Sequence, residues 1–173
     1  MALLFGACRP VAAQRILREA TSLGAEEILT CGTDKAEASY LKAGLWTSGG
    51  ASGGGPGGYR EHLIAGAAQA FATRIPRVRI FESLDAAVDA LRAGDAEALA
   101  LDNYEARIRL RDWTPAAGRT ALLVGPERGW STRERRLMRA AGIALAGLGE
   151  RVLRTETACV AGLTLLLARR GLL

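Results

Sequence analysis

The sequence has few residues of the kinds that bind metal ions or form disulfide bonds. Its 173 residues include three cysteines, Cys8, Cys31 and Cys159, and a single histidine, His62. No two cysteines form a C-x-x-C pair, so together with one histidine they do not supply the ligands of a zinc cluster. We therefore expect a reduced, cytoplasmic protein with no metal site.

We expect neither a secretory signal peptide nor a membrane-spanning helix in these residues. The apolar run 2–8 has no basic residue before it and ends at Arg9, which does not fit a secretory signal peptide. The apolar tail 158–168 is too short to cross a bilayer and is typical of a core helix. Because 49% of the residues are hydrophobic, we expect a single domain over residues 1–173 with a substantial core.

Lysine is scarce and arginine is abundant. Of the 23 basic residues only Lys35 and Lys42 are lysines, and the formal net charge is +5. Guanidinium groups fit the geometry of phosphate, so the charge is compatible with RNA or another anionic ligand. A GC-rich genome would produce the same preference for arginine, because alanine and glycine are also abundant, and composition leaves both explanations open.

Short apolar runs typical of strands alternate with stretches of helical spacing. We expect six strands, at 2–6, 27–30, 78–81, 98–101, 120–124 and 143–148, and five helices, beginning near Pro10, Tyr59, Ser83, Ser131 and Arg154. This order predicts an α/β fold with a mostly parallel sheet flanked by helices. Two helices have expected buried faces: Leu63, Ile64, Ala67, Ala68 and Phe71 in the second, and Val160, Leu163, Thr164 and Leu167 in the last.

The segment 47–58 consists mainly of glycine and other small residues and cannot contribute to a core. We expect a mobile loop there. Because it comes after a strand end, it could fold over a ligand, or it could be a plain flexible insertion.

Two glycine-bearing loops follow predicted strands in the last third of the chain. The first is 125–130, which ends where Ser131 and Glu134 form a capping box, and the second begins at Leu148 and leads into the last helix. Ligands of parallel sheets bind at the carboxyl ends of strands, so both loops should line one pocket. The turn Asp102-Asn103 is a third candidate edge of that pocket.

The composition of these loops favours ligand binding over simple turns. Gly125 and Gly129 permit close approach of the backbone, while Pro126 stiffens the loop. Neither G-x-x-x-x-G-K-[ST] nor G-x-G-x-x-G after a strand is present, which argues against ATP and dinucleotides. Arg154 suits a phosphate or a carbonyl oxygen, although Arg154 and Glu156 could instead pair with each other or cap the last helix.

The motifs Gly-Pro-Glu-Arg-Gly-Trp-Ser (125–131) and Leu-Gly-Glu-Arg-Val-Leu-Arg-Thr-Glu-Thr-Ala (148–158) together resemble the signature of the RsmE family of SPOUT methyltransferases. Members of that family methylate N3 of a uridine in 16S ribosomal RNA. A weaker likeness extends to residues 16–28 and to 67–76.

The resemblance implies S-adenosylmethionine bound in a deep trefoil knot formed by the C-terminal third, and a homodimer that completes the site. By motif match the cofactor would be held by Leu101, Gly125, Glu127, Gly129, Leu148, Gly149, Val152, Leu153 and Thr157. Arg154 would stabilise charge on the acceptor and Glu156 would serve as a base. Gln69, Arg74 and Arg128 would contact the substrate.

The chain departs from the family pattern in three places. Arg128 stands where the family prefers glycine, and the family's Ala-Glu-Gln-Ser-Gly-Arg occurs here as Ala67-Ala-Gln-Ala-Phe-Ala72. The N-terminal RNA-binding barrel usual in the family is not expected in these residues. The first hypothesis is a methyltransferase acting on a ring nitrogen, a uridine N3 in RNA or a related heterocycle; the second is a cofactor- or RNA-binding module that has lost turnover.

Overall fold

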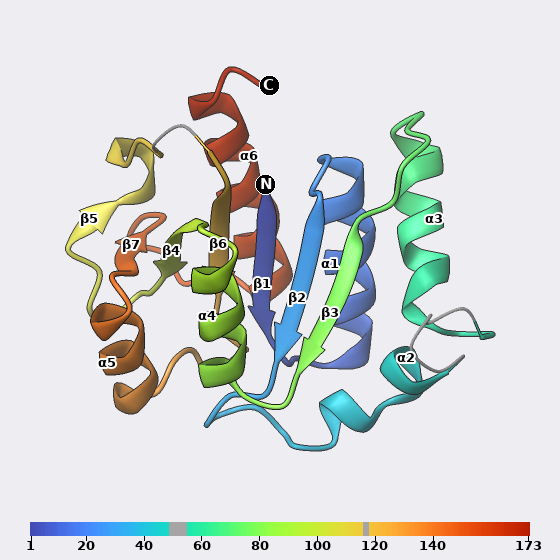
Figure 1. Cartoon of the computed structure of the whole chain (residues 1–173), viewed down its shortest axis with the longest axis horizontal. Coiled ribbons are helices and arrows are strands. Elements are labelled where there is room, and N and C mark those ends of the chain that lie inside the picture. Colours follow the sequence, from blue (N-terminus) through green and yellow to red (C-terminus); the bar gives the residue numbers. More distant parts are fainter. Residues whose placement is uncertain (49–54, 116–117) are drawn as a thin grey trace.

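A parallel β-sheet covered by helices on both faces forms the body of the molecule (Figure 1). The computed structural model describes residues 1–48, 55–115 and 118–173. The sheet has the order β3-β2-β1-β6-β4-β7-β5, and every neighbouring pair is parallel. The strands are β1 (Ala2–Gly6), β2 (Glu27–Cys31), β3 (Arg77–Phe81), β4 (Glu97–Leu101), β5 (Ile108–Arg109), β6 (Thr120–Val124) and β7 (Ala144–Gly147). The predicted α/β fold with a mostly parallel sheet is therefore confirmed.

The helices lie in two layers. They are α1 (Pro10–Ser22), α2 (Gly44–Thr47), α3 (Tyr59–Gln69), α4 (Leu84–Ala93), α5 (Thr132–Ala140) and α6 (Thr155–Arg169), with short 3-10 turns at Tyr40–Lys42 and Leu110–Asp112. Figure 1 shows α1, α3 and α6 on one face of the sheet and α4 and α5 on the other. Among the described residues, no helix is both long and apolar enough to cross a membrane.

The central strands read as continuous apolar runs because both of their faces are covered. Along β1, Leu3 and Phe5 pack into the cluster beneath α1 and α6, while Leu4 packs into the cluster beneath α4 and α5. All five residues of β1 are buried, and so are those of β2 and β6. Because these strands are parallel, their carboxyl ends share one edge of the sheet, at the bottom of Figure 1.

The buried faces of α3 and α6 differ from the sequence prediction. Ile64 is 52% exposed, and Ala68, Phe71 and Thr164 are exposed as well. Gly66 and Gly162 instead lie at the centres of the buried faces. A Cβ at Gly66 would lie 2.3 Å from the carbonyl oxygen of Arg18 in α1, so α3 packs through its glycine. The prediction failed because glycine was not counted as part of an apolar stripe.

Further boundaries also differ. The helix that begins at Tyr59 ends at Gln69, before Phe71, which was expected on its buried face, and Thr47 belongs to α2 rather than to the glycine-rich loop. Residues 49–54 of that loop lie outside the described residues, so its expected mobility stays a prediction. β5 was missed because two residues are too few to show strand periodicity. β4 lies between β6 and β7, and the C-terminal trefoil knot stays a prediction.

The end of α3 holds a non-glycine residue in the left-handed backbone region. Phe71 has φ of 52° and is 97% exposed, and the amide of Ala72 donates to the carbonyl of Ala67 across it. This is the position after a helix where glycine is favoured, because a Cβ there is strained.

We expect Phe71→Gly to raise the free energy of unfolding by about 0.5 to 1 kcal/mol, since relief of strain exceeds the added freedom of the unfolded chain. Thermal unfolding followed by circular dichroism measures the change. Phe71→Ala is the matched control, because it removes the ring but keeps the Cβ. Equal stabilisation by alanine would assign the effect to the exposed ring rather than to the backbone.

Candidate active site

A cleft of about 1100 Å³ opens at the carboxyl edge of the sheet. Its walls come from the start of α1 (residues 9–12), the end of β4 and the turn after it (101–104), the last residue of β6 with the first glycine loop (124 and 125–130), the second glycine loop (148 and 151–154) and the start of α6 (155, 156 and 158). The two loops and the Asp102-Asn103 turn therefore line one cleft, as the sequence predicted.

The first glycine loop is folded tightly against the end of β4. A Cβ at Gly125 would lie 3.2 Å from Gly129 Cα and 3.3 Å from the ring of Trp130, and Gly129 has a positive φ of 65°. The buried Trp130 indole donates through Nε1 to the carbonyl oxygen of Leu101 at 2.9 Å. This loop thus presents its backbone to the cleft in one defined conformation.

Two further contacts tie the exposed tip of this loop to neighbouring segments. The carboxylate of Glu127 accepts a hydrogen bond from the backbone N–H of Arg9 at 3.0 Å. Lys35 Nζ donates to the carbonyl oxygen of Arg128 at 3.4 Å. Glu127 therefore faces the N-terminus of α1, where a carboxylate is favoured by the helix dipole.

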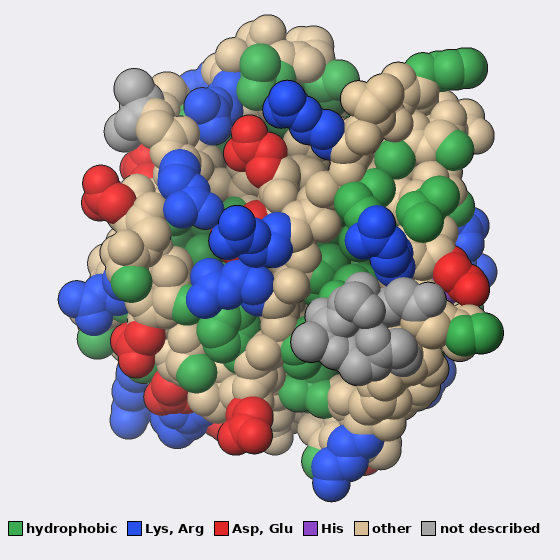
Figure 2. All heavy atoms as spheres, turned by 45° about the vertical axis from the view of Figure 1, so that its right-hand side comes forward, with side chains coloured by type: hydrophobic (Ala, Val, Ile, Leu, Met, Phe, Trp, Pro, Cys, Tyr) green, Lys and Arg blue, Asp and Glu red, His purple; other side chains and the backbone are tan. Residues whose placement is uncertain are grey.

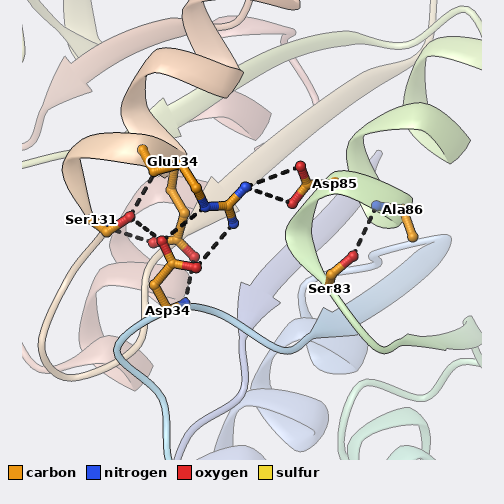
Figure 3. Close-up of polar contacts among 7 residues, drawn as sticks. Asp34, Ser83, Asp85, Ala86, Ser131 and Glu134 are labelled. Atoms are coloured by element: carbon orange, nitrogen blue, oxygen red, sulfur yellow. Dashed lines mark hydrogen bonds and ion pairs between the residues drawn. The ribbon is translucent and has the colours of Figure 1, made fainter.

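A polar network fixes the start of α5 directly after the loop (Figure 3). Ser131 and Glu134 form the predicted capping box, and the buried Glu134 carboxylate also accepts from the backbone N–H of Asp34 at 2.8 Å. Arg133 donates to both oxygens of Asp85, at 3.0 Å each, and to both oxygens of Asp34, at 3.0 and 3.1 Å. Hydrogen bonds from Arg133 and from Ser131 hold the pKa of Asp34 below its usual value.

We expect Asp34→Asn to lower the free energy of unfolding at pH 7 by less than about 1 kcal/mol, because the pair with Arg133 is partly exposed and screened by solvent. A carboxyl whose folded-state pKa is depressed contributes stability above its unfolded pKa of about 3.9 and loses it as pH falls through the folded value. The difference between parent and variant should therefore shrink below about pH 4. Urea unfolding at several pH values tests this, and a difference that grew in acid would contradict it.

The turn after β4 is organised by a buried ion pair that the sequence did not reveal. Asp102 accepts from the backbone N–H groups of Tyr104, at 2.8 Å, and Glu105, at 2.5 Å, through Oδ1, and from Arg135 Nε at 2.7 Å through Oδ2. The side chains of Asp102 and Arg135 are 1% and 6% exposed. The turn-forming character of Asp102 was readable from the sequence, but its partner 33 positions away was not.

The start of α6 places Arg154 and Glu156 at the cleft in different ways. Arg154 occupies the N-cap position with an extended backbone, makes no side-chain cap, and exposes its guanidinium. The Oε1 atom of Glu156 lies 3.7 Å from Nη1 of Arg15, and the Glu156 side chain is 18% exposed. The structure therefore pairs Glu156 with α1 and leaves Arg154 without an ion pair among the described residues.

Most of the cofactor residues named by resemblance line the cleft: Leu101, Gly125, Glu127, Gly129, Leu148, Val152 and Leu153. Gly149 lines an adjoining hollow of about 540 Å³ together with Asn103, which also lines the cleft. Thr157 is exposed and lines neither, because it lies on the opposite side of α6 from the buried Thr155, which does line the cleft.

The three expected substrate residues do not come together within one copy of the chain. Arg128 lines the cleft. Gln69 ends α3 and Arg74 precedes β3, at the amino edge of the sheet, where Ser22 Oγ at the end of α1 donates to the carbonyl of Gly66. Figure 1 shows this end of α3 at the top, opposite the carboxyl edge.

The cleft has a positive rim. Its exposed arginines are Arg9, Arg15, Arg128, Arg151 and Arg154, and each of its three carboxylates already accepts from or pairs with a neighbour within the chain. These exposed arginines favour an anionic ligand at the carboxyl edge. Basic side chains also gather in the middle of the face shown in Figure 2, which is a different surface from the carboxyl edge at the bottom of the molecule.

Cys8 precedes this rim but is not available as a nucleophile. Its side chain is buried, burial raises the pKa of its thiol, and the Glu127 carboxylate raises the pKa further. Burial also raises the pKa of Cys159 in α6. Both thiols are protonated at neutral pH, and only a thiolate is a good nucleophile.

A family model for an RNA methyltransferase domain matches residues 1–167. The chain belongs to this family of RNA methyltransferase domains. Ribosomal RNA small subunit methyltransferase E of Treponema pallidum is 35% identical over 96% of this chain and 61% of that protein. The corresponding methyltransferase E 1 of Borreliella burgdorferi is 29% identical over 91% of this chain and 63% of that protein. This RNA methyltransferase domain thus spans less than two thirds of these relatives' length.

Solved structures show that the RNA methyltransferase domain has the same fold as known methyltransferases. A crystal structure of ribosomal RNA small subunit methyltransferase E from Neisseria gonorrhoeae, bound to S-adenosyl methionine, matches with a TM-score of 0.79 at 22% identity, over 96% of this chain and 65% of that chain. The SpoU methyltransferase AviRb from Streptomyces viridochromogenes, in complex with AdoMet, matches with a TM-score of 0.65 at 17% identity, over 98% and 60%.

Proposed function

We propose that this chain transfers a methyl group from S-adenosylmethionine to a ring nitrogen in RNA, the N3 atom of a uridine. Membership of the RNA methyltransferase family supports the reaction class. The observation that carries the proposal for this chain is the meeting of two glycine loops and the end of β4 in one cleft with an arginine rim. The relatives named for ribosomal RNA support the class of acceptor.

The residues of the cleft fit the cofactor. Its volume of about 1100 Å³ is slightly larger than the roughly 300 to 1000 Å³ usual for small-molecule sites, which leaves room for part of an acceptor. Gly125 and Gly129 keep free the space that side chains would fill, and Leu101, Leu148 and Leu153 supply apolar surface. Backbone groups of the two loops would hold the cofactor, with Glu127, Gly149 and Val152 at the margins. Thr155 replaces Thr157 in this proposal, because Thr155 is the threonine that lines the cleft.

When bound, the cofactor supplies a methyl group already activated by its sulfonium. The protein then needs to hold and orient the acceptor, a task of positioning. Arg154 would donate to a carbonyl oxygen beside the reacting nitrogen and stabilise the negative charge that forms when the proton leaves. Glu156 would accept that proton once the acceptor displaces Arg15 from the carboxylate. Arg128 would contact the phosphate backbone from the rim.

We further propose a homodimer, because Gln69 and Arg74 can contact a substrate in the cleft only if a second copy brings its amino edge there. We expect light scattering at micromolar concentration to give a mass near twice 18.2 kDa. Arg74→Ala should then weaken RNA binding without changing cofactor affinity. A monomer would remove Gln69 and Arg74 from the proposed site.

The deciding experiment is incubation with S-adenosylmethionine carrying a labelled methyl group and small ribosomal subunits that lack the modification. We expect N3-methyluridine after digestion of the RNA, detected by mass spectrometry. If the protein bound the cofactor but transferred no label to ribosomal RNA, to other RNAs or to small heterocycles, the result would favour the alternative, a binding module that has lost turnover. Absence of cofactor binding would overturn both.

A further inference from the structure

Tyr104 is an exposed aromatic residue at the mouth of the cleft. Its side chain lines the cleft, yet the residue is 76% exposed. A Cβ at Gly129 would lie 3.8 Å from its Cε2 atom, so the ring stands beside the first glycine loop. Burial in the core therefore does not account for an aromatic ring at this position.

The position of Tyr104 is nevertheless well defined. Asp102 Oδ1 accepts from its backbone N–H at 2.8 Å, and the same carboxylate is held by Arg135 Nε at 2.7 Å. Both members of that ion pair are almost fully buried. A rigid turn loses little conformational freedom when a ligand binds, so it presents the ring at low entropic cost.

Arg135 also contacts the ring itself. Its guanidinium carbon is 5.1 Å from the ring centroid, within the range of a cation–π interaction. The ring is otherwise largely exposed, and the same cleft is lined by the exposed residues Arg128 and Arg151. An aromatic ring and exposed arginines in one cleft are the combination that binds single-stranded nucleic acid through base stacking and phosphate contacts.

We infer that Tyr104 is a stacking surface for a purine or pyrimidine ring at the entrance of the cleft. The inference deepens the proposed function and rests on it. Two sources can supply such a ring: the adenine of S-adenosylmethionine, or a base of the RNA next to the methylated nucleotide. The chemistry is the same for both, since every base has a π-face that stacks on tyrosine.

The test uses Tyr104→Phe, Tyr104→Leu and Tyr104→Ala in the full chain. Calorimetry measures affinity for S-adenosylmethionine, and fluorescence anisotropy measures affinity for a labelled uridine-containing single-stranded RNA. We expect phenylalanine to bind both ligands like tyrosine, and leucine and alanine to weaken one of them roughly 5- to 100-fold. The leucine variant keeps a large apolar side chain but has no aromatic face, so it shows whether stacking or apolar area alone accounts for the affinity. Leu172→Ala, which removes an exposed apolar side chain that lines neither hollow, should change neither affinity.

If only the affinity for S-adenosylmethionine fell, the stacking partner would be its adenine. If only the affinity for RNA fell, the partner would be a base of the acceptor strand. If the parent binds these ligands and Tyr104→Ala binds them as tightly, the inference is overturned while the proposed function stands. If the parent binds neither ligand, both are overturned. Melting curves check that each variant is folded, which we expect because the side chain is exposed.

Discussion

Gly125→Val is expected to weaken S-adenosylmethionine binding at least about 100-fold while most of the fold remains intact. A Cβ at this position would lie 3.2 Å from Gly129 Cα and 3.3 Å from the Trp130 ring, and the two methyl groups of valine require more space still. The loop must therefore open, which separates Trp130 from the Leu101 carbonyl. Loop and strand end then no longer form one binding surface.

Calorimetry with S-adenosylmethionine measures this loss, and circular dichroism reports on the fold. Gly44→Val is the matched control. Gly44 lies in the short helix α2 and does not line the cleft, and a Cβ there would meet no atom closer than 3.6 Å. Parent-like affinity of the Gly125 variant would place the cofactor elsewhere. Gly149→Val should have a smaller effect, since a Cβ there meets nothing within 4 Å and only the positive φ of 156° is strained.

Arg154→Ala is expected to lower kcat by roughly 100- to 1000-fold, the usual cost of losing one group that stabilises developing charge. Cofactor affinity should change little, because Arg154 is exposed at the N-cap of α6 and makes no side-chain cap whose loss would disturb the second glycine loop. Arg154→Lys should recover only part of the rate, since an ammonium lacks the planar fork of guanidinium.

Single-turnover kinetics with saturating cofactor and RNA measures the chemical step for these variants. Arg136→Ala in α5 is the control, because Arg136 is exposed and does not line the cleft. A variant that kept the parental kcat and only raised KM would show that Arg154 binds RNA without taking part in the reaction. Equal losses for Arg154→Ala and Arg136→Ala would assign both effects to net charge.

Local patterns in the sequence were sufficient to predict those parts of the site that lie within one continuous segment. The capping box of Ser131 and Glu134 fixed the end of the first glycine loop, and apolar runs located the strands around it. Contacts between distant segments carried no such signal. Asp34 and Ser131 are 97 positions apart, and Asp102 and Arg135 are 33 apart.

Helix faces were predicted less well for a related reason. Gly66 and Gly162 are the points where α3 approaches α1 and where α6 approaches β6, with a Cβ at Gly162 only 2.6 Å from a methyl of Leu122. Periodicity of large apolar residues assigns no weight to glycine. The predicted buried faces therefore included Ile64 in α3 and Thr164 in α6, both of which are exposed.

The place of β1 in the sheet limits the order in which the chain can fold during synthesis. β1 pairs with β2 on one side, but its other neighbour is β6, whose Ala121 lies opposite Ala2. Until residue 124 has left the ribosome, one edge of β1 presents unpaired backbone groups beside fully apolar side chains. Chains that stop before β6 should therefore bind chaperones or aggregate, and the cleft is completed only after residues 148–158 have also been made.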